Sequence, residues 1–315
     1  MRRSVVALLA VATLTAPACA GSDPSSANAD PNAMGPTGPL ASPRATGATS
    51  TSETTTADPE LPSPDAWIPR RPGVLADELE ATRSARRLAV DRWIASGGPS
   101  TWPPPEDVQL FTLREQRIYR VLAANDRLAT QVLDRLDQGT VGEARANVVA
   151  GAALYDHFSP VRTLPDFRVR SPKPADALRA YFEEGERGFG VHWELLAAVM
   201  LIETRMGRIV SNSSAGAQGP MQFIPSTWAA YGLGGDVHDE HDAVLGAANY
   251  LSANGAPADD RTALFHYNPV PAYVTAVTRY AKAMERDPDL FYAYYNWQVF
   301  VRTRRGDVRL TGPGL

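Results

Sequence analysis

The stretch Leu195–Gly207, "LLAAVMLIETRMG", decides the fold because its apolar residues leave no face of a helix for water. The eight residues from Leu195 to Ile202 are all apolar. A helix that is apolar on every side must be covered on every side by other elements. One acidic residue, Glu203, follows this run directly. The sequence therefore predicts a central, buried helix that carries a carboxyl group into the core.

The position of Glu203 on this helix suggests chemistry. Leu196 and Met200 precede it by seven and three residues, so the three side chains share one helix face. Burial disfavours the ionised form of a carboxyl group and raises its pKa. An acid that is still protonated near neutral pH can donate a proton to a poor leaving group. Alternatively, Glu203 could pair with Arg205 or Arg208, or point to solvent.

The segment 211–228, "SNSSAGAQGPMQFIPSTW", is too rich in glycine and other small residues to be a buried helix. Gly216 and Gly219 permit backbone conformations and close approaches that other residues cannot adopt. Ser213 and Gln222 add neutral hydrogen-bonding groups. A loop of this kind beside an acid-bearing helix predicts an open groove that suits an uncharged, amide-bearing polymer such as a glycan.

Helical periodicity dominates the rest of the folded part. We expect helices within residues 74–96, 113–136, 140–159, 175–188, 242–255, 261–268 and 271–287. The prolines of "FRVRSPKP" (167–174) predict a boundary near Ser171. Asp242 is the expected N-cap of its helix, and Gly255 is the expected stop after Asn254. The predicted fold class is mostly α, with strands only in short pieces.

The segment 289–303, "DLFYAYYNWQVFVRT", is dense in aromatic residues. Such rings could form a strip that stacks on sugar rings, or they could pack in the core of the helical bundle. We favour core packing, because aromatic side chains bury large apolar areas.

The N-terminal stretch 1–20, "MRRSVVALLAVATLTAPACA", is typical of a secretory signal peptide, which we assign to residues 1–18. Its apolar run is too short for a bilayer, which needs about 20 apolar residues. Cys19 is the chain's only cysteine. An exported protein rarely keeps one unpaired thiol, so a single cysteine at the cleavage site favours thioether lipidation of Cys19 at a new N-terminus. The alternative is ordinary cleavage that leaves Cys19 in, or just before, a flexible tail.

Residues 19–66 are dominated by Ser, Thr, Ala, Pro and Gly and are expected to form a disordered tether. Residues 67–171 are expected to form an N-terminal helical region, 172–290 the domain that holds Glu203, and 291–315 an aromatic-rich segment that packs on this domain. Removal of Arg2 and Arg3 with the signal peptide would change the formal charge from −4 to −6. That balance argues against a basic patch and a nucleic-acid partner.

Four motifs occur in a fixed order: "ETRMG", "SSAGAQGPMQFIPSTW", "DAVLGAANYLSANG" and "HYN". Together they resemble the SLT-type lytic transglycosylases of bacterial peptidoglycan, and are most similar to the membrane-bound B type and its actinobacterial relatives. The resemblance covers about residues 191–284, and the combination is specific although each motif alone is weak. It implies a lysozyme-like transglycosylase fold with an additional N-terminal helical region.

By this resemblance, six residues form the site: the acid/base Glu203 and the substrate contacts Ser213, Met221, Gln222, Tyr267 and Asn268. Two alternatives stay open. Tyr267 and Asn268 could simply end a helix before Pro269, and Met221 could belong to the core. The proline after the Tyr–Asn pair departs from the family pattern and affects the expected role of Asn268.

The resemblance implies cleavage of the MurNAc–GlcNAc β-1,4 bond with formation of 1,6-anhydroMurNAc. Glycosidases usually need two carboxylates, whereas residues 211–228 contain no acid. A single acid/base suffices if the nucleophile belongs to the substrate. The alternatives are a hydrolytic muramidase and an inactive cell-wall-binding lipoprotein.

No cofactor and no metal ion are expected. The segment 232–243, "GLGGDVHDEHDA", lies where B-type enzymes often carry a calcium loop, but it is shorter. It lacks the alternating oxygen ligands and the closing glutamate of a twelve-residue calcium loop. Its "HDEH" run could suggest zinc, but a solvated turn is the simpler interpretation.

The expected partners are peptidoglycan glycan strands and, through a lipid on Cys19, the outer face of the cytoplasmic membrane. A cell-wall synthase or peptidase could dock on the N-terminal helical region.

Overall fold

Helices supply nearly all the regular structure of the computed structural model, which describes residues 59–315. The expected mostly-α class, with a helical region ahead of the helix that bears Glu203, is confirmed. The expected signal peptide, Cys19 and the tether up to residue 58 lie outside the described residues. None of the helices described is both long and apolar enough to cross a membrane.

The helices are α1 (Pro72–Ala95), α2 (Glu106–Ala123), α3 (Asp126–Leu133), α4 (Gln138–His157), α5 (Ala175–Phe189), α6 (Trp193–Thr204), α7 (Pro225–Tyr231), α8 (Glu240–Ala253), α9 (Asp260–Tyr267), α10 (Pro271–Arg286) and α11 (Leu290–Tyr295). A short 3₁₀ turn, η1 (Gly98–Ser100), follows α1, and the chain ends with an antiparallel hairpin, β1 (Phe300–Thr303) and β2 (Gly306–Arg309).

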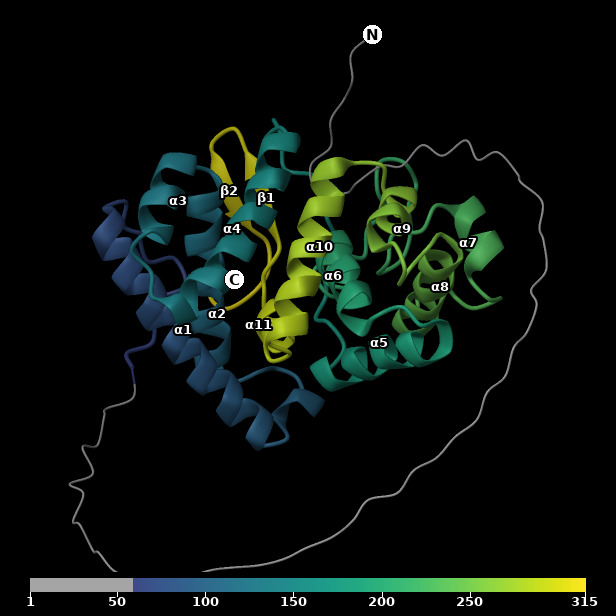
Figure 1. Cartoon of the computed structure of the whole chain (residues 1–315), viewed down its shortest axis with the longest axis horizontal. Coiled ribbons are helices and arrows are strands. Elements are labelled where there is room, and N and C mark those ends of the chain that lie inside the picture. Colours follow the sequence, from purple (N-terminus) through teal and green to yellow (C-terminus); the bar gives the residue numbers. More distant parts are fainter. Residues whose placement is uncertain (1–58) are drawn as a thin grey trace, which may run out of the picture. The chain divides into compact units, whose positions relative to one another are not determined.

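Helix α10 lies at the centre of this arrangement (Figure 1). It packs against α4 of the N-terminal helical region and against α6, the helix that bears Glu203. Helices α5, α7, α8 and α9 gather on the α6 side, whereas α1 to α3 lie on the α4 side (Figure 1). Residues 60–315 thus form one compact unit with a continuous core.

Two boundaries differ from expectation. The apolar periodicity over 113–136 continues through what are two helices, because α2 ends at Ala123 and Asn125 caps α3 by accepting from the backbone N–H of Leu128. The expected N-cap Asp242 is wrong. Asp239 caps α8 instead, and its carboxylate accepts from the backbone N–H groups of His241 and Asp242.

The aromatic C-terminal segment packs in the core. Phe291 is fully buried, and its ring lies edge-on to those of Phe182 and Trp193. The Tyr294 hydroxyl donates to Oδ1 of Asn147 on α4 over 2.9 Å. The segment therefore connects α5 and α6 with the N-terminal helical region, and these buried rings are not available for a sugar.

A buried ion cluster joins the N-terminal helices. Arg86 on α1, 1% exposed, lies 2.8 Å from Glu143 on α4 and 3.0 Å from Glu115 on α2. Burial raises the pKa of Glu115 to about 7, against the opposing effect of the Arg86 charge. Arg83 also pairs with Glu143, at 2.7 Å, but Arg86 is the cation that contacts both carboxylates.

Replacement of Arg86 by Met should therefore destabilise the protein strongly, because it leaves two buried acids without their shared cation. We expect the free energy of unfolding to fall by about 3–5 kcal/mol in denaturant titrations. The control is Arg92→Met, which breaks the pair with Asp107 on a surface where Arg92 is about half exposed; its loss should stay below about 1 kcal/mol. Equal, small losses in both variants would contradict the role given to the cluster.

Candidate active site

Glu203 lies one residue before the end of α6, inside the core. Every α6 residue from Leu195 to Thr204 is buried, and Glu203 itself is 3% exposed. The helix ends sharply because Arg205, Met206 and Gly207 all adopt left-handed backbone angles, with φ of 53°, 60° and 77°. The turn reverses the chain directly after the acid. The expectation of a buried carboxyl group on an apolar helix is thereby realised.

Burial raises the pKa of Glu203 to about 8, and the hydroxyl of Tyr273 lowers it in part. Tyr273, on α10, is fully buried beside the carboxyl group, but its hydroxyl lacks a hydrogen bond of normal geometry to any described residue. At neutral pH the carboxyl group is therefore mostly protonated. Tyr273 escaped the sequence analysis, since only the packing of α10 on α6 brings it here.

Neither arginine that could have neutralised Glu203 does so. Arg205 donates from Nη1 to the carbonyl of Leu201 over 2.6 Å. Arg208 donates to the carbonyl of Arg205 over 3.1 Å. Because the left-handed turn directs both side chains elsewhere, the alternatives of an ion pair or of exposure to solvent are not realised for Glu203.

Thr204 joins the end of α6 to the glycine-rich loop. Its hydroxyl donates to the carbonyl of Pro220 over 2.7 Å and accepts from the N–H of Gly207 over 3.1 Å. The loop turns back on itself at Gly219, which has a φ of 72°; a Cβ there would lie 1.8 Å from the carbonyl oxygen of Val237. The sequence did not predict this positioning role of Thr204, because the only feature that distinguishes the residue in the sequence is a hydroxyl group next to Glu203.

Ser213 and Gln222 are both buried in this loop. The Ser213 Oγ accepts from the N–H groups of Ala215 and Ala217, over 3.2 and 2.9 Å, and so shapes the loop. Gln222 has a φ of 52°, and its Nε2 donates to Gly219 over 2.9 Å. Its Oε1 is buried and has no hydrogen bond to any residue that the structure describes. Left-handed backbone and an unsatisfied acceptor each cost about 1–3 kcal/mol, and they are typical of functional sites.

Tyr267 and Asn268 end α9, as one alternative held, and Tyr267 also reaches the loop. Its hydroxyl donates to the carbonyl of Met221 over 2.6 Å. Burial and the nearby Glu203 raise its pKa, as they do for Tyr273. Asn268 is buried, and its Oδ1 has no hydrogen bond within residues 59–315. The Met221 side chain is fully buried in the core, so Met221 contributes to the site only its backbone carbonyl, which accepts from Tyr267.

Within the described part of the chain, no other carboxylate contributes to the pKa of Glu203. The buried acid next to the turn is Glu240, whose Oε1 would lie 3.5 Å from a Cβ at Gly207. Glu240 is occupied by an ion pair with Arg170 and by Lys173 at 3.7 Å. Among the described residues, the site therefore offers one proton-transfer carboxyl group rather than a pair.

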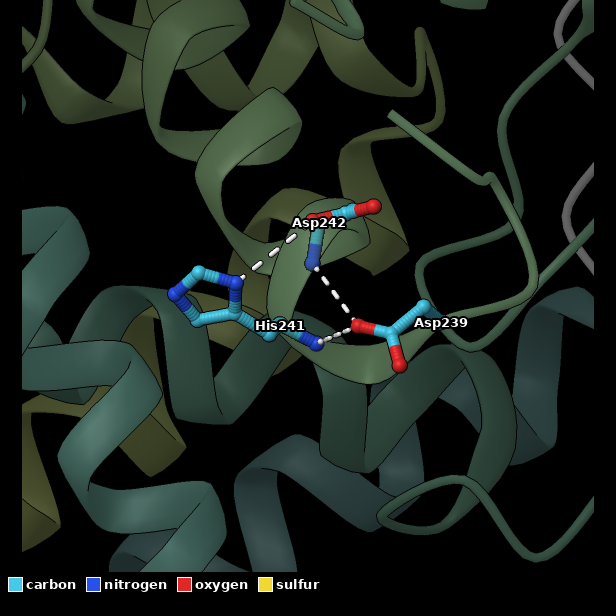
Figure 2. Close-up of side chains that lie close together, drawn as sticks. All are labelled: Asp239, His241 and Asp242. Carbon is cyan, nitrogen blue, oxygen red and sulfur yellow. Dashed lines mark hydrogen bonds and ion pairs between the residues drawn. The ribbon is translucent and has the colours of Figure 1, made fainter. Parts of the chain in front are cut away.

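Figure 2 shows the cluster of Asp239, His241 and Asp242 in the "HDEH" region. Asp239 caps α8 through N–H groups at 2.9 and 3.2 Å. The His241 ring lies 3.0 Å from Glu184 and 3.5 Å from Asp242. Burial lowers the pKa of His241, but these two carboxylates outweigh it and raise the pKa overall. Helix capping and ion pairing account for the cluster.

Comparison with known proteins places a family match over this site. Residues 180–289 match the family described as "Transglycosylase SLT domain". The membrane-bound lytic murein transglycosylase F of Thiobacillus denitrificans is 30% identical over 162 residues, which cover 47% of this chain and 34% of that protein. The chain thus spans about a third of the length of this relative. No solved structure matches. These findings support an SLT-type transglycosylase domain, without specific support for the B type.

The raised pKa of Glu203 predicts a pH-dependent cost to folding. Between an unfolded value of 4.5 and a folded value of about 8, the folded protein retains a proton that the unfolded chain releases. The wild type should therefore lose stability as pH rises through this range. Glu203→Gln escapes this loss, so its advantage in unfolding free energy should grow from near zero at pH 4 to about 3–5 kcal/mol at pH 8.

Denaturant titrations at pH 4, 6 and 8 measure this difference. Glu285→Gln, an exposed change on α10, is the matched control and should show no such trend. A difference between wild type and Glu203→Gln that does not vary with pH would contradict the burial argument.

Proposed function

We propose that the chain is an exported peptidoglycan lytic transglycosylase that cleaves the MurNAc–GlcNAc β-1,4 bond and forms 1,6-anhydroMurNAc. The observation that carries the proposal is Glu203: a buried carboxyl group with a pKa of about 8 and no second carboxylate acting on it. The SLT match over residues 180–289 supports the same substrate class.

In the proposed reaction, protonated Glu203 donates its proton to the bridging oxygen as the glycosidic bond breaks. The N-acetyl group of the muramyl sugar stabilises the positive charge that develops at the anomeric carbon. The Glu203 carboxylate then accepts the proton of the C6 hydroxyl, whose oxygen closes the anhydro ring. Because nucleophile and electrophile belong to one sugar, closure benefits from an effective molarity of about 10⁵ M or more.

The environment of Glu203 suits both proton transfers. Burial favours the neutral acid, so the group is loaded with a proton at neutral pH. The same burial makes the carboxylate formed in the first step a stronger base, which favours proton return from the hydroxyl. The buried Tyr273 hydroxyl could donate to the carboxylate at that stage.

Unsatisfied polar atoms supply the proposed substrate contacts. The buried acceptors Gln222 Oε1 and Asn268 Oδ1 have no partner among the described residues. Amide N–H and hydroxyl groups of an N-acetylated glycan are the donors that would satisfy them. Ser213, whose Oγ already accepts two N–H groups, retains its own proton for a substrate oxygen.

The hydrolytic muramidase is the less favoured alternative. Inversion needs a second carboxylate that activates water, and retention through a protein nucleophile needs one close to the acid. The ion pair with Arg170 and the neighbouring Lys173 commit Glu240 to another role. An inactive cell-wall-binding lipoprotein would gain nothing from an unpaired buried acid, which costs stability at neutral pH.

Several finer assignments belong to this proposal. The catalytic domain would span residues 172–290, with 67–171 as the helical region on which a synthase or peptidase could dock. Residues 1–18 would direct export, Cys19 would carry a lipid on the outer face of the cytoplasmic membrane, and the part of the 19–66 tether that precedes the compact unit beginning at residue 60 would give the domain reach. The resemblance of the motifs to the B type stays a prediction, because the relative from Thiobacillus denitrificans is of the F type.

Digestion of purified sacculi with mass analysis tests the reaction. The wild type should release muropeptides with anhydro ends, one water lighter than hydrolysed ends. Glu203→Gln should cleave at least about 10³-fold more slowly, because it cannot transfer the proton, while it still binds sacculi. If all products carry reducing ends, the protein is a hydrolytic muramidase. If the wild type cleaves no faster than Glu203→Gln, the protein is an inactive cell-wall-binding lipoprotein.

Intact mass and fractionation test the lipid. Protein extracted from bacterial membranes should have the mass of the chain from Cys19 to Leu315 plus a diacylglyceryl group attached to Cys19 by a thioether. Cys19→Ser should move the protein from the membrane to the soluble fraction. If the wild-type protein is soluble and its mass shows no lipid, the lipidation hypothesis is wrong and ordinary signal-peptide cleavage is the correct interpretation.

A further inference from the structure

A pocket separate from the Glu203 site lies between the N-terminal helices and the C-terminal segment. The cavity itself has a volume of about 70 Å³, and the space between atoms rises to about 740 Å³ when the open solvent at its mouth is included. Its walls come from α2, α4, α10, the residues around β1 and β2, and Arg205. None of the residues assigned to the Glu203 site lines it.

Arg205 is a buried cation in this pocket and has no carboxylate partner among residues 59–315. It is 9% exposed, and its one hydrogen bond within the described residues goes from Nη1 to the carbonyl of Leu201. Burial lowers the pKa of Arg205 to about 10, so the guanidinium group stays charged at neutral pH. Arg120, which lines the same pocket, is paired with Asp307 at 2.8 Å, so Asp307 does not serve as a counter-ion for Arg205. An uncompensated buried charge costs several kcal/mol, so an anion beside Arg205 would be strongly favoured.

The neighbouring Arg208 shows how this chain accommodates a buried arginine by other means. Its guanidinium group lies over the rings of Trp102 and Tyr295, at 5.7 and 5.4 Å from their centres. Such cation–π contacts offset part of the loss of water. Arg205 makes no contact of this kind in the described part of the chain, so its charge is left for a ligand.

Aromatic rings line the same pocket. Tyr119, Tyr280 and Trp297 line the pocket, and the Trp297 ring lies 5.6 Å from that of Tyr280 and 6.4 Å from that of Tyr119. The indole Nε1–H of Trp297 is buried without a hydrogen bond among the described residues. The pocket therefore combines a flat apolar wall, an unused N–H donor and an unpaired cation.

The mouth adjoins a wide groove of about 750 Å³ that is rich in arginine. Arg120, Arg302, Tyr155 and Asp307 line both the pocket and the groove. The other basic residues of the groove are Arg70, Arg117, Arg304 and Arg309, against two acids, Asp65 and Asp307. On a chain whose formal charge is −4, this local excess of positive charge would draw anions towards the pocket.

We propose that this pocket is a binding site for a small organic carboxylate with a flat, apolar body. The carboxylate pairs with Arg205, and the body lies against the rings of Tyr119, Tyr280 and Trp297. The site is independent of the proposed cleavage reaction, since it uses other residues and requires no chemistry at Glu203.

Calorimetric titration of the purified protein tests this assignment with three probes: benzoate, 2-naphthoate and indole-3-acetate. Each is compared with its neutral primary amide, which keeps the shape and removes the charge. At least one carboxylate should bind with a Kd below about 1 mM, and its amide should bind at least about tenfold more weakly. Binding of none of the three carboxylates, or equal binding of acid and amide, would overturn the proposal.

Variants assign the charge to its residue. Arg205→Met removes the cation at similar volume and should weaken carboxylate binding at least tenfold. Arg304→Gln is the matched control, because Arg304 lines the groove but not the pocket and is exposed; it should bind like the wild type. Equal weakening in both variants, or unchanged binding in Arg205→Met, would point to the groove surface and overturn the site.

Because Arg205 occupies a left-handed position, circular dichroism and thermal unfolding must first show that Arg205→Met is folded. If it is not, Arg120→Gln serves in its place, since Arg120 lines the pocket on the flank of α2. This variant should weaken carboxylate binding at least threefold, relative to Arg304→Gln. Equal affinities in these two variants would overturn the proposal in the same way.

Discussion

The complete enclosure of α6 is the constraint on which the rest of the structure depends. A helix with an apolar surface on every side is stable only when other elements cover all of it. Helices α5, α8, α10 and α11 each contact α6 and together provide this cover. The carboxyl group of Glu203 lies in the core because the apolar helix that bears it is stable only when it is buried. The chemistry of the site is thus a consequence of packing, with the cost of burying an acid met by the apolar contacts around it.

Helix α10 links this enclosure to the remainder of the molecule. Tyr273 lies beside Glu203, and Tyr280, seven residues later on the same face, lies about 10 Å further along the helix and lines the arginine pocket. On its other side α10 packs on α4, which the buried Arg86 cluster ties to α1 and α2. The N-terminal helical region therefore supports the site helix through one shared element.

Local features of the sequence were sufficient for much of this picture. The apolar run of α6, the acid that follows it and the glycines of the next loop depend on near neighbours, so the mostly-α class and a buried Glu203 could be predicted. Tyr273 and Thr204 could not, since their roles arise from contacts between segments brought together by folding. The Asp242 prediction failed because "DVHDEHD" offers several acids, and only the path of the backbone decides that Asp239 meets the free N–H groups of α8.

The small exposed fraction of Glu203 has a consequence for how the site would exchange protons. A buried acid that worked by hydrolysis would need a relay of polar groups or ordered water to regain its proton from bulk solvent after each turnover. In the proposed reaction the substrate's own C6 hydroxyl returns that proton, so the cycle closes without any net proton or water crossing the protein surface. Apolar residues on all sides of the carboxyl group are then compatible with repeated turnover in the proposed reaction.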